Sequence, residues 1–211
     1  MNVLVVVAHH DDLELGCGGT VAKLVENGHA VTSLVLTHSG YENCTGEVIR
    51  SKGKAAREGM AAATVLGYKL INLEEDTFDL EVKDENLCKI LNVIEQCKAD
   101  TILTHWHGDT HPPHHAANVM VMHATRNVPN VYGFAVNWYS GTEVFCPRVF
   151  VAIEDVHWER RESALRQYET EFARTGSRWL EYSDRQTLNY GVQAGVKRAE
   201  GLVVYKSLWA I

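Results

Sequence analysis

The sequence predicts an α/β fold in which a mainly parallel sheet carries helices on both faces. Two observations support this prediction. Short apolar runs typical of buried strands alternate along the chain with longer segments of helical periodicity. Polar residues follow several of these runs, as expected at the carboxyl ends of parallel strands, where ligands bind.

The first half of the chain alternates in this way. Residues 3–7 form an unbroken apolar run, which indicates a buried strand. Residues 21–27 form the body of a helix that ends at Gly28, because glycine readily adopts the left-handed conformation after a helix. The same argument ends a longer helix at Gly67. The expected elements of this half are strands at 3–7, 30–36 and 70–73 and helices at 21–27 and 47–66.

The second half continues the pattern. Apolar residues recur at spacings of three and four over 86–96, which indicates an amphipathic helix. A helix over 112–124 tolerates Pro112 in its first turn, and Asp109 or Thr110 is expected to cap it. The remaining expected elements are strands at 101–103 and 149–153, a helix at 156–172 and a mixed C-terminal tail.

Composition indicates one ordinary globular domain over residues 1–211, with 45% hydrophobic and 22% charged residues. The net charge of -7 and the scattered lysines and arginines argue against binding to nucleic acid or to an anionic membrane. The N-terminal apolar run is too short for a signal peptide or a membrane span. The five cysteines lack close pairs, which favours reduced thiols and a cytoplasmic protein.

Two dense clusters of polar residues each follow a predicted strand. The stretch AHHDDLELGCGGT begins at Ala8, and HWHGDTHPPHH runs from His105 to His115. The carboxyl ends of parallel strands lie along one edge of a sheet, so both clusters are expected at that edge. Histidine and aspartate side chains together favour a metal site there.

The first cluster offers both metal ligands and a base. A catalytic zinc site needs about three nitrogen or oxygen ligands, an open position for water, and a base that is not itself a ligand. If His9 and Asp12 bind the metal, Asp11 lies between them and is free to accept a proton from the water. Adjacent aspartates on a turn point in different directions, so the two can take different roles.

The second cluster contains HPPH, in which His111 and His114 lie three residues apart at a helix start and face the same side. One of the two can bind the metal while the other faces the reacting group. The ligand set is then His9, Asp12 and His114. Two imidazoles and a carboxylate suit Zn(II) but also accept Fe(II), Mn(II) or Co(II), so the ligands do not identify the metal.

Each cluster alone has a simpler explanation. Adjacent aspartates most often form a turn or a helix cap, and an HxxH pair is more often structural than metal-binding. Gly16, Gly18 and Gly19 also suggest a phosphate-binding loop. That loop, GCGG, lacks the lysine of a P-loop and the GxGxxG spacing of a dinucleotide site. The position of both clusters after strands of one sheet favours a metal site over these alternatives.

The two clusters also resemble known motifs. AHHDDLELGCGGT resembles the AHPDDxE signature of the LmbE-like or PIG-L-like zinc-dependent N-deacetylases, and HPPHHAA resembles their HPDHxxA signature. Weaker matches follow in the same order, among them a helix that ends in LGY at Leu66 and AEG at Ala199. The resemblance spans nearly the whole chain. The Rossmann-like sheet of the family agrees with the fold predicted above.

The resemblance implies a role for each of five residues. His9, Asp12 and His114 would bind zinc, and Asp11 would be the general base. His111 would polarise the substrate carbonyl or protonate the leaving group, and in its protonated form would stabilise the oxyanion together with zinc. The substrate would be a small acetylated amino sugar or its conjugate. A homo-oligomer is common in the family.

Three positions depart from the family pattern. The proline of AHPDD is His10 here, and the aspartate of HPDH is Pro113, so Asp109 is a candidate to orient a histidine instead. The arginine that commonly lies three residues before a helix glutamate, here Glu58, is Ala55. The candidates to replace this arginine are Lys52, Lys54 and Arg57.

Other residues have open roles. Glu14 matches the glutamate of DDxE and either holds a ligand or caps the turn. His38 stands where the family often has an aspartate, and it either contacts substrate or lies solvated in a loop. The candidates to support the metal ligands from outside are His105 and His107. The aromatic residues that either line a sugar site or pack in the core are Trp179, Tyr182 and Tyr190.

The sequence therefore predicts a cytoplasmic, zinc-dependent hydrolase that removes an N-acetyl group from an amino sugar or its conjugate, the substrate class following from the resemblance alone. One alternative is a metal-dependent hydrolase of another small amide or ester. A second is a non-catalytic sugar- or metal-binding protein of the same fold, against which Asp11 and His111 argue. A third is a nucleotide-binding protein.

Overall fold

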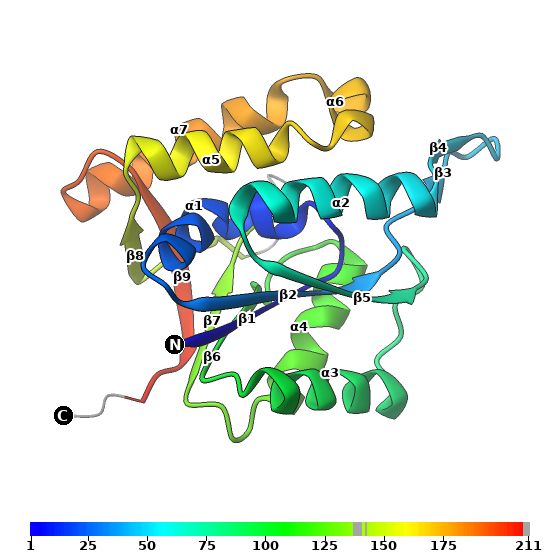
Figure 1. Cartoon of the computed structure of the whole chain (residues 1–211), viewed down its shortest axis with the longest axis horizontal. Helices are drawn as coiled ribbons and strands as arrows, with labels where there is room; N and C mark the ends of the chain where they lie inside the picture. Colours follow the sequence, from blue (N-terminus) through cyan, green and yellow to red (C-terminus); the bar gives the residue numbers. More distant parts are fainter. Residues whose placement is uncertain (137–140, 142, 209–211) are drawn as a thin grey trace.

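A seven-stranded sheet forms the centre of the computed structural model, which describes residues 1–136, 141 and 143–208 (Figure 1). Its strands are β1 (Asn2–Val7), β2 (Ala30–Thr37), β5 (Lys69–Glu75), β6 (Thr101–His105), β7 (Asn130–Phe134), β8 (Val149–Ala152) and β9 (Ala199–Lys206). They lie in the order β5, β2, β1, β6, β7, β9, β8. The first five in this order are parallel, whereas β9 runs antiparallel to β7 and β8. The predicted mainly parallel sheet is confirmed.

Helices cover both faces of this sheet, as predicted. They are α1 (Asp12–Glu26), α2 (Lys52–Leu66), α3 (Asp84–Cys97), α4 (Pro112–Ala124), α5 (Asp155–Leu165), α6 (Glu169–Thr175) and α7 (Arg178–Ala194). In Figure 1, α1, α2 and α5 lie above the sheet, and α3 and α4 lie below it.

The side chains of β1 alternate between two cores. Val3, Val5 and Val7 pack with residues of α1 and α2. Leu4 and Val6 pack with residues of α3 and α4. Because successive side chains of a strand point to opposite faces, an unbroken apolar run is what a strand with helices on both sides requires.

Local sequence signals located several boundaries correctly. The helix α4 spans the predicted range, and Gly28 has a left-handed φ of 76° after α1. The N-cap of α4 is His111, however, and no side-chain hydrogen bond caps it, so the prediction of Asp109 or Thr110 as the cap is wrong. The carboxylate of Asp109 instead accepts a hydrogen bond of 2.9 Å from the backbone N–H of His111.

The helix predicted over 47–66 is shorter than expected. Residues that precede it form β4 (Val48–Arg50), which pairs with β3 (Tyr41–Glu42) in a small antiparallel hairpin. The helix α2 begins after this hairpin because the hydroxyl of Ser51 caps it, accepting a hydrogen bond from the backbone N–H of Lys54.

The helix predicted over 156–172 is two helices, α5 and α6. The backbone leaves the helical conformation at Tyr168, with φ of -85° and ψ of 65°, and the side chain of Tyr168 is fully buried. The prediction also did not resolve β7, and it left α7 and β9 within the mixed tail.

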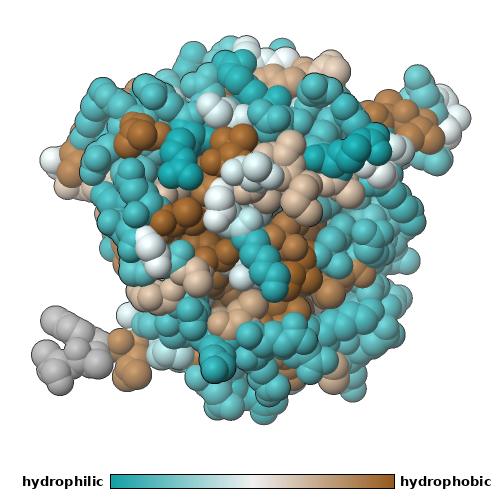
Figure 2. Space-filling model, in the orientation of Figure 1, coloured by the Kyte–Doolittle hydropathy of each residue, from teal (hydrophilic) through white to brown (hydrophobic). Residues whose placement is uncertain are grey.

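Polar side chains, teal in Figure 2, cover most of the outer surface of the helices in the view of Figure 1. Apolar side chains are visible mainly between the upper and lower layers. Among the described residues, no helix is both long enough and apolar enough to cross a membrane.

Candidate active site

Both polar clusters lie at the carboxyl edge of the sheet, as predicted. His9, Asp11 and Asp12 follow β1, whereas His111 and His114 lie at the start of α4, after β6. The strands β1 and β6 are parallel neighbours. The topology therefore brings together side chains that are 105 positions apart in sequence, as for His9 and His114.

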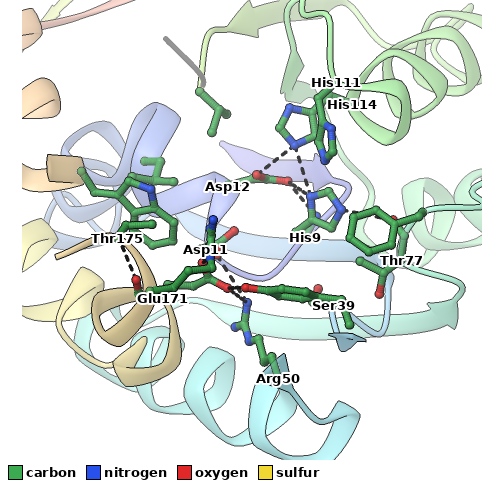
Figure 3. A pocket seen from close by; sticks show the side chains of 16 residues that line it. His9, Asp11, Asp12, Ser39, Arg50, Thr77, His111, His114, Glu171 and Thr175 are labelled. Atoms are coloured by element: carbon green, nitrogen blue, oxygen red, sulfur yellow. Dashed lines mark hydrogen bonds and ion pairs between the residues drawn. The ribbon is translucent and has the colours of Figure 1, made fainter. Parts of the chain in front are cut away.

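The three predicted ligands converge on one point (Figure 3). Nδ1 of His9 lies 3.2 Å from Nε2 of His114 and 3.3 Å from Oδ2 of Asp12. Nε2 of His114 lies 3.2 Å from Oδ1 of Asp12. Donor atoms bound at about 2.0–2.1 Å to a tetrahedral zinc ion are about 3.3–3.4 Å apart. The spacing therefore fits a divalent metal held by these three residues.

Hydrogen bonds on the outer side of both rings orient them toward this point. Nε2 of His9 lies 3.3 Å from the carbonyl oxygen of Thr77, and Nδ1 of His114 lies 2.8 Å from Oδ2 of Asp109. An N–H on each outer nitrogen donates to the oxygen, so the inner nitrogen directs a lone pair into the site. Asp109 therefore orients His114, the role considered for it from the sequence.

The electrostatics of the cluster favour a cation. Burial opposes a positive charge on His114, but the carboxylates of Asp12 and Asp109 outweigh burial and raise the pKa of His114 to about 10. Burial also opposes the ionisation of Asp12, yet the neighbouring imidazoles, that of His114 foremost, hold its pKa well below its usual range. A site that stabilises a proton between these groups also suits a metal ion, which competes with that proton.

His105 supports the cluster from outside. Its ring stacks on that of His114, with centroids 3.9 Å apart and an angle of 12° between the planes. Its Nε2 lies close enough to Asp12 and His114 to form one group of possible metal ligands, and His9, His111 and His114 form another. Nε2 of His105, however, accepts a hydrogen bond of 3.0 Å from the backbone N–H of Ala8. Its lone pair is therefore already engaged within the protein.

His111 faces the same cavity as the three donors. Its ring centroid lies 5.2 Å from that of His9 and 4.6 Å from that of His114. Burial and the neighbouring imidazoles lower the pKa of His111 to about 4. A pKa of about 4 favours a neutral ring at pH 7, and the protonated His111 expected during the reaction stays a prediction. A neutral ring still donates one hydrogen bond.

Asp11 lines this cavity but does not join the three donors. Its carboxylate faces the opposite wall, where Nη1 of Arg50 donates a hydrogen bond of 3.4 Å to its Oδ2 (Figure 3). Burial raises the pKa of Asp11 to about 6, although Arg50 opposes this rise. The adjacent carboxylates of Asp11 and Asp12 therefore point in different directions, as predicted.

The cavity between these walls has a volume of about 220 Å³. Away from the donors, its lining combines aromatic, hydroxyl and charged side chains, a mixture suited to a ligand with both apolar faces and hydroxyl groups. These residues include Ser39, Tyr41, Thr77, Phe78, Glu171, Arg174, Thr175 and Trp179. Of the C-terminal aromatics considered for a sugar site, Trp179 lines the cavity.

Three residues with open roles lie outside the metal donors. His10 is buried with its ring against α2. The carboxylate of Glu14 accepts hydrogen bonds from the hydroxyls of Tyr68 (2.7 Å) and Tyr168 (3.0 Å), so it anchors two tyrosines rather than a ligand or the turn. His38 is buried, and its Nδ1 accepts a hydrogen bond of 3.0 Å from the backbone N–H of Gly40.

The glycine-rich stretch forms a break in α1 rather than a phosphate loop. At Cys17 the backbone leaves the helical conformation, with φ of -149° and ψ of 25°. The backbone N–H groups of Gly19 and Thr20, which a phosphate would need, donate to the carboxylate of Glu200 at 2.9 and 2.6 Å. On the other side of the break, Arg161 donates to the freed backbone carbonyls. Arg161 and Glu200, which form a buried ion pair, therefore satisfy the backbone groups on both sides of the break.

Arg50 is among the pocket residues that sequence analysis missed, because the helix predicted over 47–66 placed it on a helix. Its Nε lies 3.3 Å from Oε2 of Glu58, so it supplies the positive charge expected beside that glutamate. None of the three candidates from the sequence forms a hydrogen bond or an ion pair with Asp11 among the described residues. Lys54 forms ion pairs with both Glu58 (3.7 Å) and Glu169 (2.7 Å), so it too stands beside that glutamate. The other two candidates, Lys52 and Arg57, are exposed.

Known proteins resemble this chain in sequence and in fold. The family model described as PIG-L, GlcNAc-PI de-N-acetylase, matches residues 4–125, which include both polar clusters. The diacetylchitobiose deacetylase of Thermococcus kodakarensis is 29% identical over 95% of this chain and 81% of its own length. The 4-oxalmesaconate hydratase of Pseudomonas putida is 25% identical over 100% of this chain and 89% of its own length.

Among solved structures, a conserved protein from Thermus thermophilus superposes with a TM-score of 0.82 at 24% identity. The match covers 100% of this chain and 97% of that chain. At this identity the match establishes the fold, and the α/β architecture described above agrees with it.

Proposed function

Because this chain belongs to the PIG-L, GlcNAc-PI de-N-acetylase family, we propose that it is a metal-dependent hydrolase that removes the acetyl group from the nitrogen of an amino sugar or its conjugate. The similarity to a diacetylchitobiose deacetylase supports the substrate class. The observation that carries the proposal is the convergence of donor atoms from His9, Asp12 and His114 at 3.2–3.3 Å beside a cavity that Asp11 also lines.

In this proposal His9, Asp12 and His114 hold Zn(II), or Fe(II), Mn(II) or Co(II) in its place. When bound, the metal supplies a positive charge that polarises the amide carbonyl and acidifies a water molecule. Asp109 keeps the Nδ1–H of His114 engaged, so that the opposite nitrogen faces the metal.

The residues of the chain carry the proton transfers. Asp11 accepts a proton from the attacking water while the oxygen of that water bonds to the carbonyl carbon. His111, neutral at pH 7, donates a hydrogen bond to the carbonyl oxygen as negative charge develops there. The carbon–nitrogen bond then breaks, the proton on Asp11 passes to the amine nitrogen, and acetic acid leaves and gives up its proton to the solvent as acetate.

Acetate release from N-acetylated amino sugars and their glycosides tests this function. The purified protein is assayed before chelation, after chelation, and after each of the four metals is restored. We expect release that chelation abolishes and at least one metal restores. O-acetylated sugars and N-acylated amines without a sugar form the control panel and separate an amino-sugar deacetylase from a hydrolase of other amides or esters. Consumption of an unsaturated acid without acetate release would support a hydratase instead.

A further inference from the structure

Arg50 lies at the centre of a buried network of charges. It ends the hairpin strand β4, and its side chain is 2% exposed. Its guanidinium faces three carboxylates, with Nη1 3.4 Å from Asp11 and 3.6 Å from Glu171, and Nε 3.3 Å from Glu58. One cation therefore joins Asp11 to two carboxylates that lie on other helices.

The two outer carboxylates are themselves held in place. Glu58 accepts hydrogen bonds from the backbone N–H (3.0 Å) and the hydroxyl (2.7 Å) of Thr170. Glu171 accepts a hydrogen bond of 2.8 Å from the hydroxyl of Tyr41. With both anchors fixed, the guanidinium of Arg50 has little freedom to turn, so its position is set independently of Asp11.

Asp11, in contrast, depends on Arg50. Among the described residues, Arg50 is the one side chain that forms an ion pair or a hydrogen bond with the Asp11 carboxylate. Asp11 is the N-cap of α1, yet its side chain makes no capping hydrogen bond. A base must be aimed at the proton that it removes, and the contact with Arg50 is the polar contact that can set this aim among the described residues.

We infer that Arg50 is a positioning residue that holds the Asp11 carboxylate in the orientation needed to accept the proton of the attacking water. This inference rests on the proposed function. Nε and Nη2 of Arg50 are buried and do not face the cavity. Arg50 therefore acts on the reaction through Asp11 rather than by binding substrate with those two nitrogens. The network also links the base to Tyr41, which lines the wall of the cavity.

A double-mutant cycle tests the inference with metal at saturation. kcat for acetate release is measured in the wild type, Arg50→Met, Asp11→Asn and the double variant. We expect Arg50→Met to lower kcat about 100-fold in the wild-type background, since a misplaced reacting group costs about that much. In the Asp11→Asn background we expect less than about a 2-fold further loss, because the group that Arg50 positions is no longer a base. Metal content is expected to stay unchanged throughout.

Equal losses in the two backgrounds would overturn the inference, since Arg50 would then act independently of Asp11. Full activity of Asp11→Asn would also overturn the inference, because Asp11 would then not be the base. Absence of metal-dependent acetate release from the wild type would instead overturn the proposed function, so the two failures are distinct. Arg50→Lys, which keeps the charge, should recover part of kcat, and it replaces Arg50→Met in the cycle if that variant does not fold. Arg126→Met, an exposed change of the same type, is the control and should leave kcat unchanged.

Discussion

The carboxylate of Asp109 lies 2.8 Å from Nδ1 of His114, the nitrogen on the far side of the ring from Asp12. Its other oxygen accepts the backbone N–H of His111 at 2.9 Å. One side chain thus orients a metal donor and fixes the start of α4. Asp109 lies in the loop before α4. It supplies the carboxylate that the HPDH signature would place at position 113, where this chain has Pro113.

Removing this charge should weaken metal binding. We expect Asp109→Asn to raise the Kd for zinc about 10- to 100-fold, the usual effect of losing an outer partner of a metal-bound histidine. Competition with a chromophoric chelator measures the Kd. Asp84→Asn, at the exposed start of α3, is the matched control. Equal Kd values for Asp109→Asn and the wild type would show that Asp109 does not support the site.

The ion pair across the break in α1 should matter for stability. Arg161 and Glu200 are buried, with Nη1 3.2 Å from Oε1. Glu200→Ala leaves a buried guanidinium and two backbone N–H groups without this partner, so we expect a loss of about 3–5 kcal/mol in the free energy of unfolding. Urea denaturation measures this loss. Glu162→Ala, which breaks the more exposed pair with Arg166, should cost no more than about 1 kcal/mol. Similar losses in both variants would contradict the role given to Glu200.

Gly16 should tolerate no side chain, because a Cβ at this position would overlap the ring of Phe134. We expect Gly16→Ala to lower the free energy of unfolding by about 1–3 kcal/mol. Gly53→Ala, where a Cβ would find its nearest neighbour at 3.5 Å in the first turn of α2, should leave stability unchanged or raise it by up to about 1 kcal/mol. A phosphate-binding role of this stretch would not require Gly16→Ala to be less stable than Gly53→Ala. Urea denaturation of both variants measures the difference.

Glu14 should make stability depend on pH. Burial raises its pKa from 4.5 to about 7, although the hydroxyls of Tyr68 and Tyr168 oppose the rise. Between these values the unfolded chain loses a proton that the folded chain keeps, so the free energy of unfolding falls as pH rises. Glu14→Gln removes this dependence. Relative to the wild type, we expect the variant to gain about 3 kcal/mol between pH 4 and pH 8. Parallel stability curves over that range would contradict a buried, protonated Glu14.

The parts of the fold that follow from local patterns could be predicted from the sequence. β1 is an unbroken apolar run, and α4 is bounded by Pro112 and by the end of its periodic pattern. The long-range partners of other elements could not be predicted. Tyr168 interrupts a periodic segment, and its hydroxyl lies against the backbone carbonyl of His10, a contact that nothing near Tyr168 in sequence announces.

The candidate site divides in the same way. Residue type and spacing within two short motifs were enough to place His9, Asp12 and His114 together. The groups that orient these motifs come from elsewhere. Arg50 reaches Asp11 from a hairpin that the sequence presents as part of a helix, so its role depends on tertiary structure.

Metal content and acetate release, measured together in two variants, separate the base from the metal donors. We expect Asp11→Asn to keep about one metal ion per chain but to lose nearly all turnover, because it removes the base and leaves the three donors intact. His114→Ala should lose both the metal and turnover. Wild-type turnover in Asp11→Asn, or full metal content in His114→Ala, would contradict the division of this site into a base and three metal donors.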